Sequence, residues 1–392
     1  MKSYLAPSAL NRDFSISGIS TKGNYAFFLP NLLAIFTVFA LLTSCNSQHS
    51  AEKKGYKKDD NRAVGDTLSE MLDKGMMVIF QDKQGNHWFA GGDGGAYKYD
   101  GKNLVLFREK DGLCSNAILG IQDDQFGNVY FDTPEGVSKF DGRKFTTLPI
   151  VDDTLSGNQW TMPSEDLWFR MGWDENGPYH YDGTSLRHMA FPKHGRVDTF
   201  YATYPNVSYS PSGIYFIYHD KKGAVWFGTA SLGVCRYDGT SLSWLYEEQI
   251  TLTPGGGDFG IRSILEDKNG HFWFCSSQNW FEILPTVSTV NGTNYLNYLK
   301  GEGFGYPMEN GEEAFLYFMS MVEDDQGDMW MVNGDGAWHN DGKEIHHYPL
   351  KDGETDAWGF VIYKDHQGEL WVGTRFAGVF KFNGNAFERF KG

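Results

Sequence analysis

The sequence carries few residues at the spacings that catalysis needs. Its 11 histidines include one adjacent pair, His346 and His347, and no two are separated as in the His-x-x-x-His zinc motif. No Gly-x-Ser-x-Gly elbow is present, and the glycine run at 255–257 is not followed by the Lys-Ser/Thr of a phosphate loop. These features favour a binding protein over an enzyme, and the question of activity stays open at this point.

One acidic segment, 324–328, is a candidate for calcium binding. It reads Asp-Asp-Gln-Gly-Asp, but it lacks the spacing and the bidentate glutamate of an EF-hand loop. The same Asp-x-x-Gly sequence recurs along the chain, so we interpret it as a turn in which Asp caps backbone N–H groups. We predict no metal and no other cofactor, with calcium as the alternative.

Arginine, amide and aromatic side chains are better candidates for a functional site. Aromatic faces stack on a sugar ring, while guanidinium and amide groups hydrogen-bond its hydroxyl or carboxylate groups. Trp280 and Phe376 have the alternative role of filling a channel or packing against a neighbouring sheet. The predicted ligand-binding residues are Arg170, Trp173, Arg262, Gln278, Trp280, Trp358, Arg375 and Phe376.

These residues are embedded in a unit that repeats along the chain, seen most clearly at 80–101, 218–239 and 363–384. Each unit has an alternating apolar run, Asp-x-x-Gly, an aromatic marker, a loop of small residues, and a second apolar run that ends in Asp-Gly or Asn-Gly. The mean spacing of the markers, about 47 residues, is typical of four-stranded propeller blades. The markers are Trp88, Tyr130, Trp168, Trp226, Trp273, Trp330 and Trp371.

Each unit predicts four antiparallel strands, a to d, because Asp-x-x-Gly and Asp-Gly are both tight-turn sequences. One such sheet cannot bury its two faces alone, so neighbouring sheets must cover each other and enclose the marker rings. We predict an all-β fold, a seven-bladed β-propeller of four-stranded antiparallel blades over 64–392. Residues 261–265 are predicted as a strand a and 386–390 as the last strand d, while 64–74 is expected to lie across a rim.

The repeated Asp-x-x-Gly-x-x-Trp frame followed by Tyr-Asp-Gly resembles the two-component regulator propeller repeat family, the periplasmic sensor propeller of hybrid two-component regulators. The resemblance covers most of 76–390, although the full Trp-x-Gly-Thr form occurs only at 226–229 and 371–374. Regulators of that family continue into a second propeller, a transmembrane helix, a kinase and a receiver, none of which follows in this sequence. The resemblance therefore implies a stand-alone ligand-binding or sensory role without a kinase.

Two other functions stay open: a protein-interaction scaffold, and a propeller lyase resembling virginiamycin B lyase. A lyase would need a histidine at the mouth of the channel as an acid–base group. The histidines available for that role are His180, His188, His194 and His219.

The alternation of strands places the b–c loops and the d-to-a connections on one face. The long irregular segments all fall there: 151–165, 187–213, 247–260 and 284–315. Binding residues concentrate on variable loops held by a rigid scaffold, so we predict a small-molecule or oligosaccharide site, or a protein contact, on this face.

The N-terminal segment predicts export and a lipid anchor. Residues 29–42 are an apolar run preceded by Lys2, Arg12 and Lys22, which suits a signal peptide better than a membrane span. The following Leu-Thr-Ser-Cys resembles a bacterial lipobox, with an ordinary signal peptide as the alternative. We predict a signal peptide at 1–44, lipidation of Cys45, a flexible tether at 45–63, and a position in the cell envelope on the periplasmic or surface side.

The charge composition limits the classes of molecule that the protein is expected to bind. The chain of 392 residues carries 34 basic and 50 acidic residues, a formal net charge of −16. Such a surface repels phosphate backbones, so we expect no nucleic-acid partner and membrane attachment only through the lipid.

Overall fold

The computed structural model describes residues 62–392 except 73–74, 157–158, 173–174, 252–259 and 308–312. Asn61–Gly392 forms one compact unit. The predicted signal peptide, Cys45 and nearly all of the tether lie outside the described residues. Within the described residues, no helix is long and apolar enough to cross a membrane.

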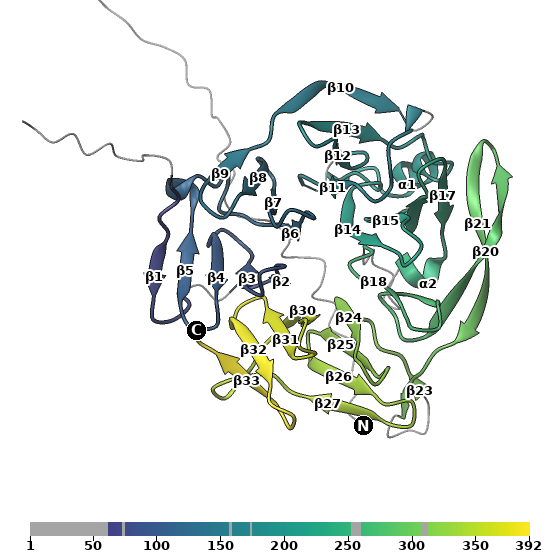
Figure 1. The fold of residues 1–392 in the computed structure, drawn as a ribbon. Helices are drawn as coiled ribbons and strands as arrows, with labels where there is room; N and C mark the ends of the chain where they lie inside the picture. The colour runs from purple at the N-terminus through teal and green to yellow at the C-terminus, as the bar shows by residue number, and fades with distance from the viewer. Residues whose placement is uncertain (1–61, 73–74, 157–158, 173–174, 252–259, 308–312) are drawn as a thin grey trace, which may run out of the picture. The chain divides into compact units, whose positions relative to one another are not determined.

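Antiparallel sheets follow one another along the chain around a common centre (Figure 1). The first sheet contains β1 (Asp66–Leu68), β2 (Val78–Gln81), β3 (His87–Ala90), β4 (Ala96–Tyr99) and β5 (Leu104–Phe107). The next contains β6 (Gly120–Asp123), β7 (Val129–Thr133), β8 (Gly136–Phe140) and β9 (Phe145–Thr147). The third contains β10 (Ile150–Ser156), β11 (Leu167–Phe169), β12 (Tyr179–Tyr181) and β13 (Leu186–Ala190).

An eight-stranded sheet comes next, made of two four-stranded runs that meet at a single parallel bridge, Trp244 to Tyr295. One run is β14 (Ile214–His219), β15 (Val225–Thr229), β16 (Val234–Tyr237) and β17 (Leu242–Leu245). The other is β18 (Ile264–Glu266), β19 (Phe272–Phe274), β20 (Asn279–Val290) and β21 (Thr293–Glu302).

Two four-stranded sheets complete the described part of the chain. They are β24 (Ser320–Glu323), β25 (Met329–Asn333), β26 (Gly336–Asn340) and β27 (Ile345–Tyr348), then β30 (Gly359–Lys364), β31 (Leu370–Thr374), β32 (Val379–Phe382) and β33 (Phe387–Phe390). The short pairs β22 (Tyr306–Pro307) with β23 (Glu313–Ala314) and β28 (Lys351–Asp352) with β29 (Thr355–Asp356) precede them. The all-β prediction is confirmed.

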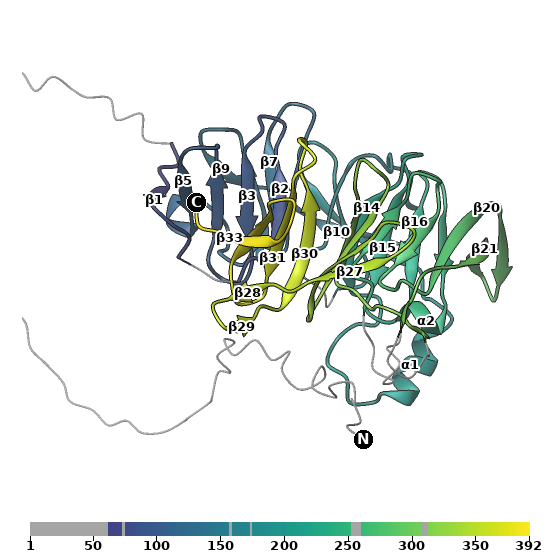
Figure 2. The same ribbon diagram turned by 90° about the horizontal axis from the view of Figure 1, so that it is seen from below.

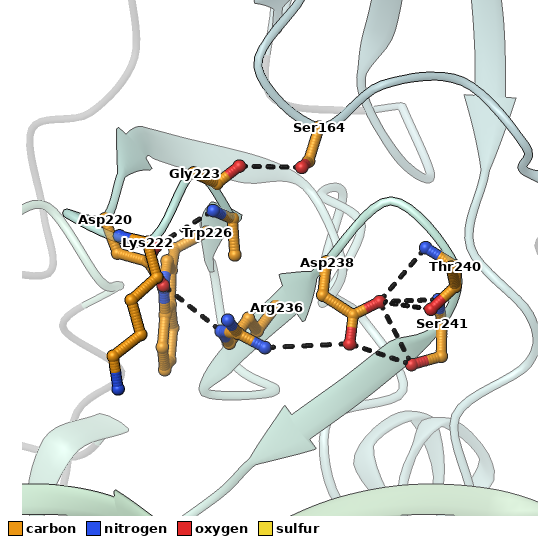
Figure 3. A network of polar contacts seen from close by, with 10 residues as sticks. Ser164, Asp220, Lys222, Gly223, Trp226, Arg236, Asp238, Thr240 and Ser241 are labelled. Carbon is orange, nitrogen blue, oxygen red and sulfur yellow. Dashed lines mark hydrogen bonds and ion pairs between the residues drawn. The ribbon is translucent and has the colours of Figure 1, made fainter. Parts of the chain in front are cut away.

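The Asp-x-x-Gly turn and the marker aromatic act as one structural unit, shown for the β14–β17 run in Figure 3. Asp220 Oδ1 accepts hydrogen bonds from the backbone N–H groups of Lys222 and Ala224, and Oδ2 accepts from Trp226 Nε1 at 2.9 Å. Gly223 completes the turn with a φ of 85°, which favours glycine. The same bond from the marker to the turn aspartate recurs at Trp88, Tyr130, Trp273, Trp330 and Trp371.

A cationic side chain on strand c lies over most of these marker rings, a feature that the sequence analysis missed. Lys98 Nζ is 5.7 Å from the Trp88 ring and Lys381 Nζ is 4.9 Å from the Trp371 ring. Arg236 lies over Trp226 and donates from Nε to Asp220 Oδ2 at 3.2 Å, so the cation also balances the turn carboxylate.

The first and last described sheets lie side by side, so the series of sheets closes on itself (Figure 1). Phe89 and Trp371 share one buried cluster, and the Gln81 N–H donates to Tyr363 Oη at 3.0 Å. The β33 strand belongs to the same sheet as β30–β32, so the prediction that 386–390 forms the last strand d is confirmed.

Several segments have a structure other than the predicted one, mostly because they pair with the free edge of another strand. Residues 66–68 do not cross a rim but pair with β5, and β10 in 151–165 pairs in parallel with the outer edge of β13. Most of 284–302 is not a loop but the distal part of the β20–β21 hairpin, and the predicted strand at 261–265 begins only at Ile264. Each edge strand satisfies N–H and C=O groups that would otherwise face solvent.

Two of the four long segments predicted to face the ligand, 187–213 and 247–260, contain helices, α1 (Val197–Thr203) and α2 (Glu248–Thr251). Both helices project from one side of the sheets (Figure 2). The inner strands begin on this side, and the second strands end on it. We call this side the loop rim. The Asp-x-x-Gly and Asp-Gly turns occupy the opposite side, which we call the turn rim.

Candidate functional site on the loop rim

Arg170 connects three consecutive sheets on the loop rim. It follows β11, and its Nη1 donates to the carbonyl oxygen of Tyr215 at 2.6 Å, while Nη2 donates to the carbonyl oxygen of Leu119. Its backbone N–H donates to Asp132 Oδ2 at 3.1 Å, and the same carboxylate faces the guanidinium. Leu119 precedes β6 and Tyr215 lies in β14, so one side chain fixes the starts of two inner strands.

Burial shapes the electrostatics of this pair. It raises the pKa of Asp132, and the Arg170 guanidinium opposes that rise. Burial also lowers the pKa of Arg170, while Asp132 opposes that effect. Each charge is thus stabilised by the other, which makes the pair costly to break.

Arg262 reaches the same point from the residues just before the next inner strand, β18. Its guanidinium carbon lies 4.1 Å from the centre of the Tyr215 ring, at the typical distance of a cation–π contact. Burial lowers the pKa of Arg262; Tyr215 and Cys275 oppose this effect, and the charge of Arg170 adds to it. Two of the predicted residues therefore converge on Tyr215, which the sequence analysis did not single out.

Cys275 supports this arrangement from behind. Its Sγ accepts hydrogen bonds from the backbone N–H groups of Arg262, at 3.1 Å, and Ser263, at 3.3 Å. Burial raises the pKa of Cys275 to about 11, so it stays a neutral thiol. Cys235 is buried as well, so both cysteines are small residues of the core.

Trp358, Arg375 and Phe376 form a second group. The Arg375 guanidinium lies 5.5 Å from the Trp358 ring and 5.0 Å from the Phe376 ring, and its backbone N–H donates to the Trp358 carbonyl. Phe376 is 63% exposed, so it does not fill a channel. An exposed aromatic ring beside a guanidinium can stack on a sugar ring and bind its hydroxyl groups.

The other predicted residues join neither group. Trp280 stacks on His271 with 3.9 Å between ring centres and packs against the cluster around Trp273, so its role is packing between sheets. Gln278 precedes β20, and its backbone N–H donates to Ser276 Oγ. Trp173 lies outside the described residues.

The turn rim holds a cavity that the sequence did not predict. It has a volume of about 370 Å³ and lies between the first and last sheets. Its walls include Tyr99, Gln367, Glu369, Lys381 and Phe390. Residues so far apart in the sequence meet only because the series of sheets closes, and no local pattern signals that contact. A smaller groove of about 240 Å³ occupies the matching place between the first and second sheets, so such hollows follow from the architecture.

The acidic segment 324–328 forms a capped turn. Asp324 Oδ1 accepts from three backbone N–H groups and Oδ2 accepts from Trp330 Nε1. Asp324, Asp328 and His339 offer donor atoms within 4.8 Å of one another. However, His339 pairs with Asp328 at 3.0 Å and stacks on Trp330, just as Lys381 pairs with Glu369 and lies over Trp371. The group therefore matches the repeated arrangement of carboxylate, cation and marker ring.

The four histidines considered for a lyase occupy separate environments. His180 pairs with Asp166 at 2.7 Å, whereas the His194 ring packs at a tilt against Trp244 and contacts Tyr295 Oη at 3.2 Å. Burial lowers the pKa of His188, of His194 to about 4, and of His219. Within the described residues, none of the four belongs to a group of three potential metal ligands.

No family model matches the sequence, and no curated protein matches it. Solved structures do resemble the chain. The extracellular domain of BT3049 from B. thetaiotaomicron, assigned to a hybrid two-component system, superposes with a TM-score of 0.52 at 16% identity, over 79% of this chain and 40% of that one. The extracellular domain of BT4673 from the same organism, assigned to a one-component system, gives 0.51 at 18% identity, over 84% and 40%.

Virginiamycin B lyase from Staphylococcus aureus gives a TM-score of 0.54 at 16% identity, over 81% of this chain and 97% of the lyase. This chain thus spans about two fifths of the two extracellular domains but nearly the whole lyase. At these identities the likeness establishes the fold, and the chain folds as a β-propeller of the kind found in these extracellular domains and in this lyase.

Proposed function

We propose that the protein is an extracytoplasmic sensory propeller that binds a carbohydrate or another small ligand on its loop rim. The convergence of Arg170 and Arg262 on Tyr215 carries this proposal. Arg170 is balanced by Asp132 and fixes the start of β14, so the Arg262 guanidinium on the Tyr215 ring is the group that favours a ligand with a carboxylate, such as an acidic saccharide. Trp358, Arg375 and Phe376 offer a second contact for a longer ligand.

The family resemblance and the sheet order support a ring of seven blades. In this reading the eight-stranded sheet counts as two blades, because a single bridge joins its two runs. The β10–β13 sheet is then the irregular blade: it lacks an inner strand a among the described residues, and Trp168 donates to the Ser164 carbonyl instead of a turn aspartate.

The proposal includes lipidation of Cys45 and attachment of the propeller to a membrane of the cell envelope. Its support is the apolar run at 29–42 followed by Leu-Thr-Ser-Cys. Metabolic labelling with a radioactive fatty acid tests it, since Cys45→Ser should abolish the label. A label that persists in the variant would show that the lipid, if any, is carried elsewhere.

A thermal-shift screen of the protein tests the ligand class. We expect oligomers of galacturonic acid to raise the melting temperature more than neutral oligosaccharides do. Arg262→Ala should remove that increase, whereas Arg143→Ala, an exposed arginine at an Asp-Gly turn of the turn rim, should retain it. A response to divalent metals alone would favour the lyase, and no response to any saccharide would favour the scaffold.

A further inference from the structure

Three neighbouring strands of the β24–β27 sheet place a row of aromatic and imidazole rings on one face, at the turn rim. Trp330 of β25 pairs with His339 of β26, and His339 pairs with His346 of β27. Directly opposite residues in neighbouring strands point to the same face of a sheet. His339 stacks on Trp330 with 4.1 Å between ring centres, so the two histidines continue the row that starts at the marker ring.

Two carboxylates flank this row. Asp328 precedes Trp330 by two residues and Glu344 precedes His346 by two, so the alternation of strands places both carboxylates on the face of the histidines. The contacts agree, since Asp328 Oδ2 lies 3.0 Å from His339 Nε2 and Glu344 Oε2 lies 3.9 Å from His346 Nε2. This face therefore carries two imidazoles and two carboxylates within a small area.

The separations suit ligands of one zinc ion. In a tetrahedral site with bonds of about 2.0–2.1 Å, two ligand atoms lie about 3.3 Å apart, so the 3.0 Å between Asp328 Oδ2 and His339 Nε2 needs little change. Two imidazoles bound to the same ion have ring centres about 5–6 Å apart. The rings of His339 and His346 have centres 6.0 Å apart, and His346 is exposed, so a rotation of its side chain completes the approach.

The two histidines stand where other sheets carry a permanent cation. At four other markers the residue in the place of His339 is a lysine or an arginine, and none of these faces a histidine on the outer strand. The pairs are Lys98–Val105, Lys139–Thr146, Arg236–Ser243 and Lys381–Glu388. His180 takes the place at Trp168, but it faces Arg187. An imidazole carries no permanent charge, so a divalent ion can balance Asp328 where the other sheets use a lysine or an arginine.

We propose that this face binds a divalent transition-metal ion, for which zinc fits best. Its ligands are His339, His346, Asp328 and Glu344. The ligand types select the metal, because imidazole nitrogens together with carboxylate oxygens suit zinc and its neighbours, whereas calcium and magnesium take oxygen ligands. Asp324 stays the cap of its turn, since its oxygens already accept four N–H groups.

The ion has a structural role that is independent of the ligand site on the loop rim. Its ligands lie near the starts of β25 and β27 and the end of β26, so the ion fastens the outer strand of the sheet to the two strands before it. An ion that binds the folded protein and not the unfolded chain raises the melting temperature. A zinc response in the thermal-shift screen that His346→Gln removes therefore belongs to this site and not to a lyase centre.

Calorimetric titration of the full chain with zinc chloride in a non-ionic detergent tests the proposal. His346→Gln should raise the dissociation constant of one bound zinc ion at least about tenfold. His347→Gln is the matched control, because His347 is the next residue of the same strand and is also exposed, but it points to the opposite face and stacks on Trp338. The control variant should bind zinc as tightly as the original protein does.

His339→Lys separates metal binding from stability. It introduces the cation that Lys381 provides over Trp371 in the last sheet. This variant should keep its melting temperature in the absence of zinc and lose the increase that zinc causes.

Chemical modification locates the ion without any substitution. Diethyl pyrocarbonate acylates imidazoles that carry no metal, so zinc should slow the modification of His346 and leave that of His347 unchanged, as read by tandem mass spectrometry. Calcium should protect neither residue. A modification rate at His346 that zinc does not change, or a zinc affinity that His346→Gln leaves unchanged, would overturn the proposal.

Discussion

Removing the carboxylate of Asp220 should destabilise the protein far more than removing that of Asp238, although both cap turns in the same run of strands (Figure 3). Asp220 is 7% exposed and accepts from the N–H groups of Lys222 and Ala224, from the buried indole of Trp226 and from Arg236. Asp220→Ala leaves at least two buried donors without an acceptor. At about 1–3 kcal/mol for each, together with the unbalanced guanidinium, the expected loss is about 3–5 kcal/mol.

Asp238 provides the control. It is exposed, and the backbone N–H groups of Thr240 and Ser241 that it accepts can bind water instead. Asp238→Ala should therefore cost about 1 kcal/mol. Urea denaturation followed by tryptophan fluorescence measures both. Equal losses in the two variants would refute the reasoning that the bond from the marker to the turn aspartate stabilises each sheet.

Three further outcomes are expected. Arg170→Met should lower the free energy of unfolding by about 3–5 kcal/mol, because it leaves the Asp132 carboxylate buried without its cation. If urea denaturation shows a loss below about 1 kcal/mol, Arg170 does not connect the sheets as described. Burial lowers the pKa of His194 to about 4 from an ordinary 6.5, so the unfolded chain binds a proton more readily than the folded protein does. The contribution of His194 to stability should therefore be complete above about pH 6.5 and decrease as the pH falls toward 4. In urea denaturation at pH 4.5 and 7.5, His194→Gln should reduce the difference between the two midpoints. An unchanged difference would show that other groups dominate. Calcium should shift the melting temperature by less than about 1 °C, because the oxygens of Asp324 already accept four N–H groups; a larger increase that Asp328→Ala removes would restore the calcium hypothesis.

The turns were predictable because their chemistry is local. Asp220 to Gly223 and the Asp-Gly at 238–239 carry the residues that those turns require, and the strands on either side follow from alternating apolar residues. The indole bond to the turn aspartate was not predicted, although the constant spacing of six residues between Asp and Trp is the signal that contains it.

The edge strands were not predictable from local sequence. β1, β10 and the β20–β21 hairpin each lie where they do because an outer strand elsewhere in the fold has free backbone groups, and nothing in their own residues specifies that partner. Within that hairpin the Asn-Gly at 291–292 is the sequence signal of a turn between two strands.

The candidate site was predictable in its residue types but not in its geometry. Arg170 and Arg262 were identified from their positions at strand ends, where loop-rim side chains gather. Tyr215, on which they converge, alternates within a strand like any other aromatic residue, so its role depends on the approach of two neighbouring sheets. Trp280 shows the converse, since an aromatic residue beside a loop packs between sheets.

Hydrogen exchange with and without a bound acidic saccharide tests the position of the site most directly. If the ligand binds on the loop rim, amides near Leu119, Arg170, Tyr215 and Arg262 should exchange more slowly, while those at 81–87 and 366–371 beside the turn-rim cavity should not change. Protection confined to 81–87 and 366–371 would instead place the ligand in the cavity between the first and last sheets and contradict the proposed site.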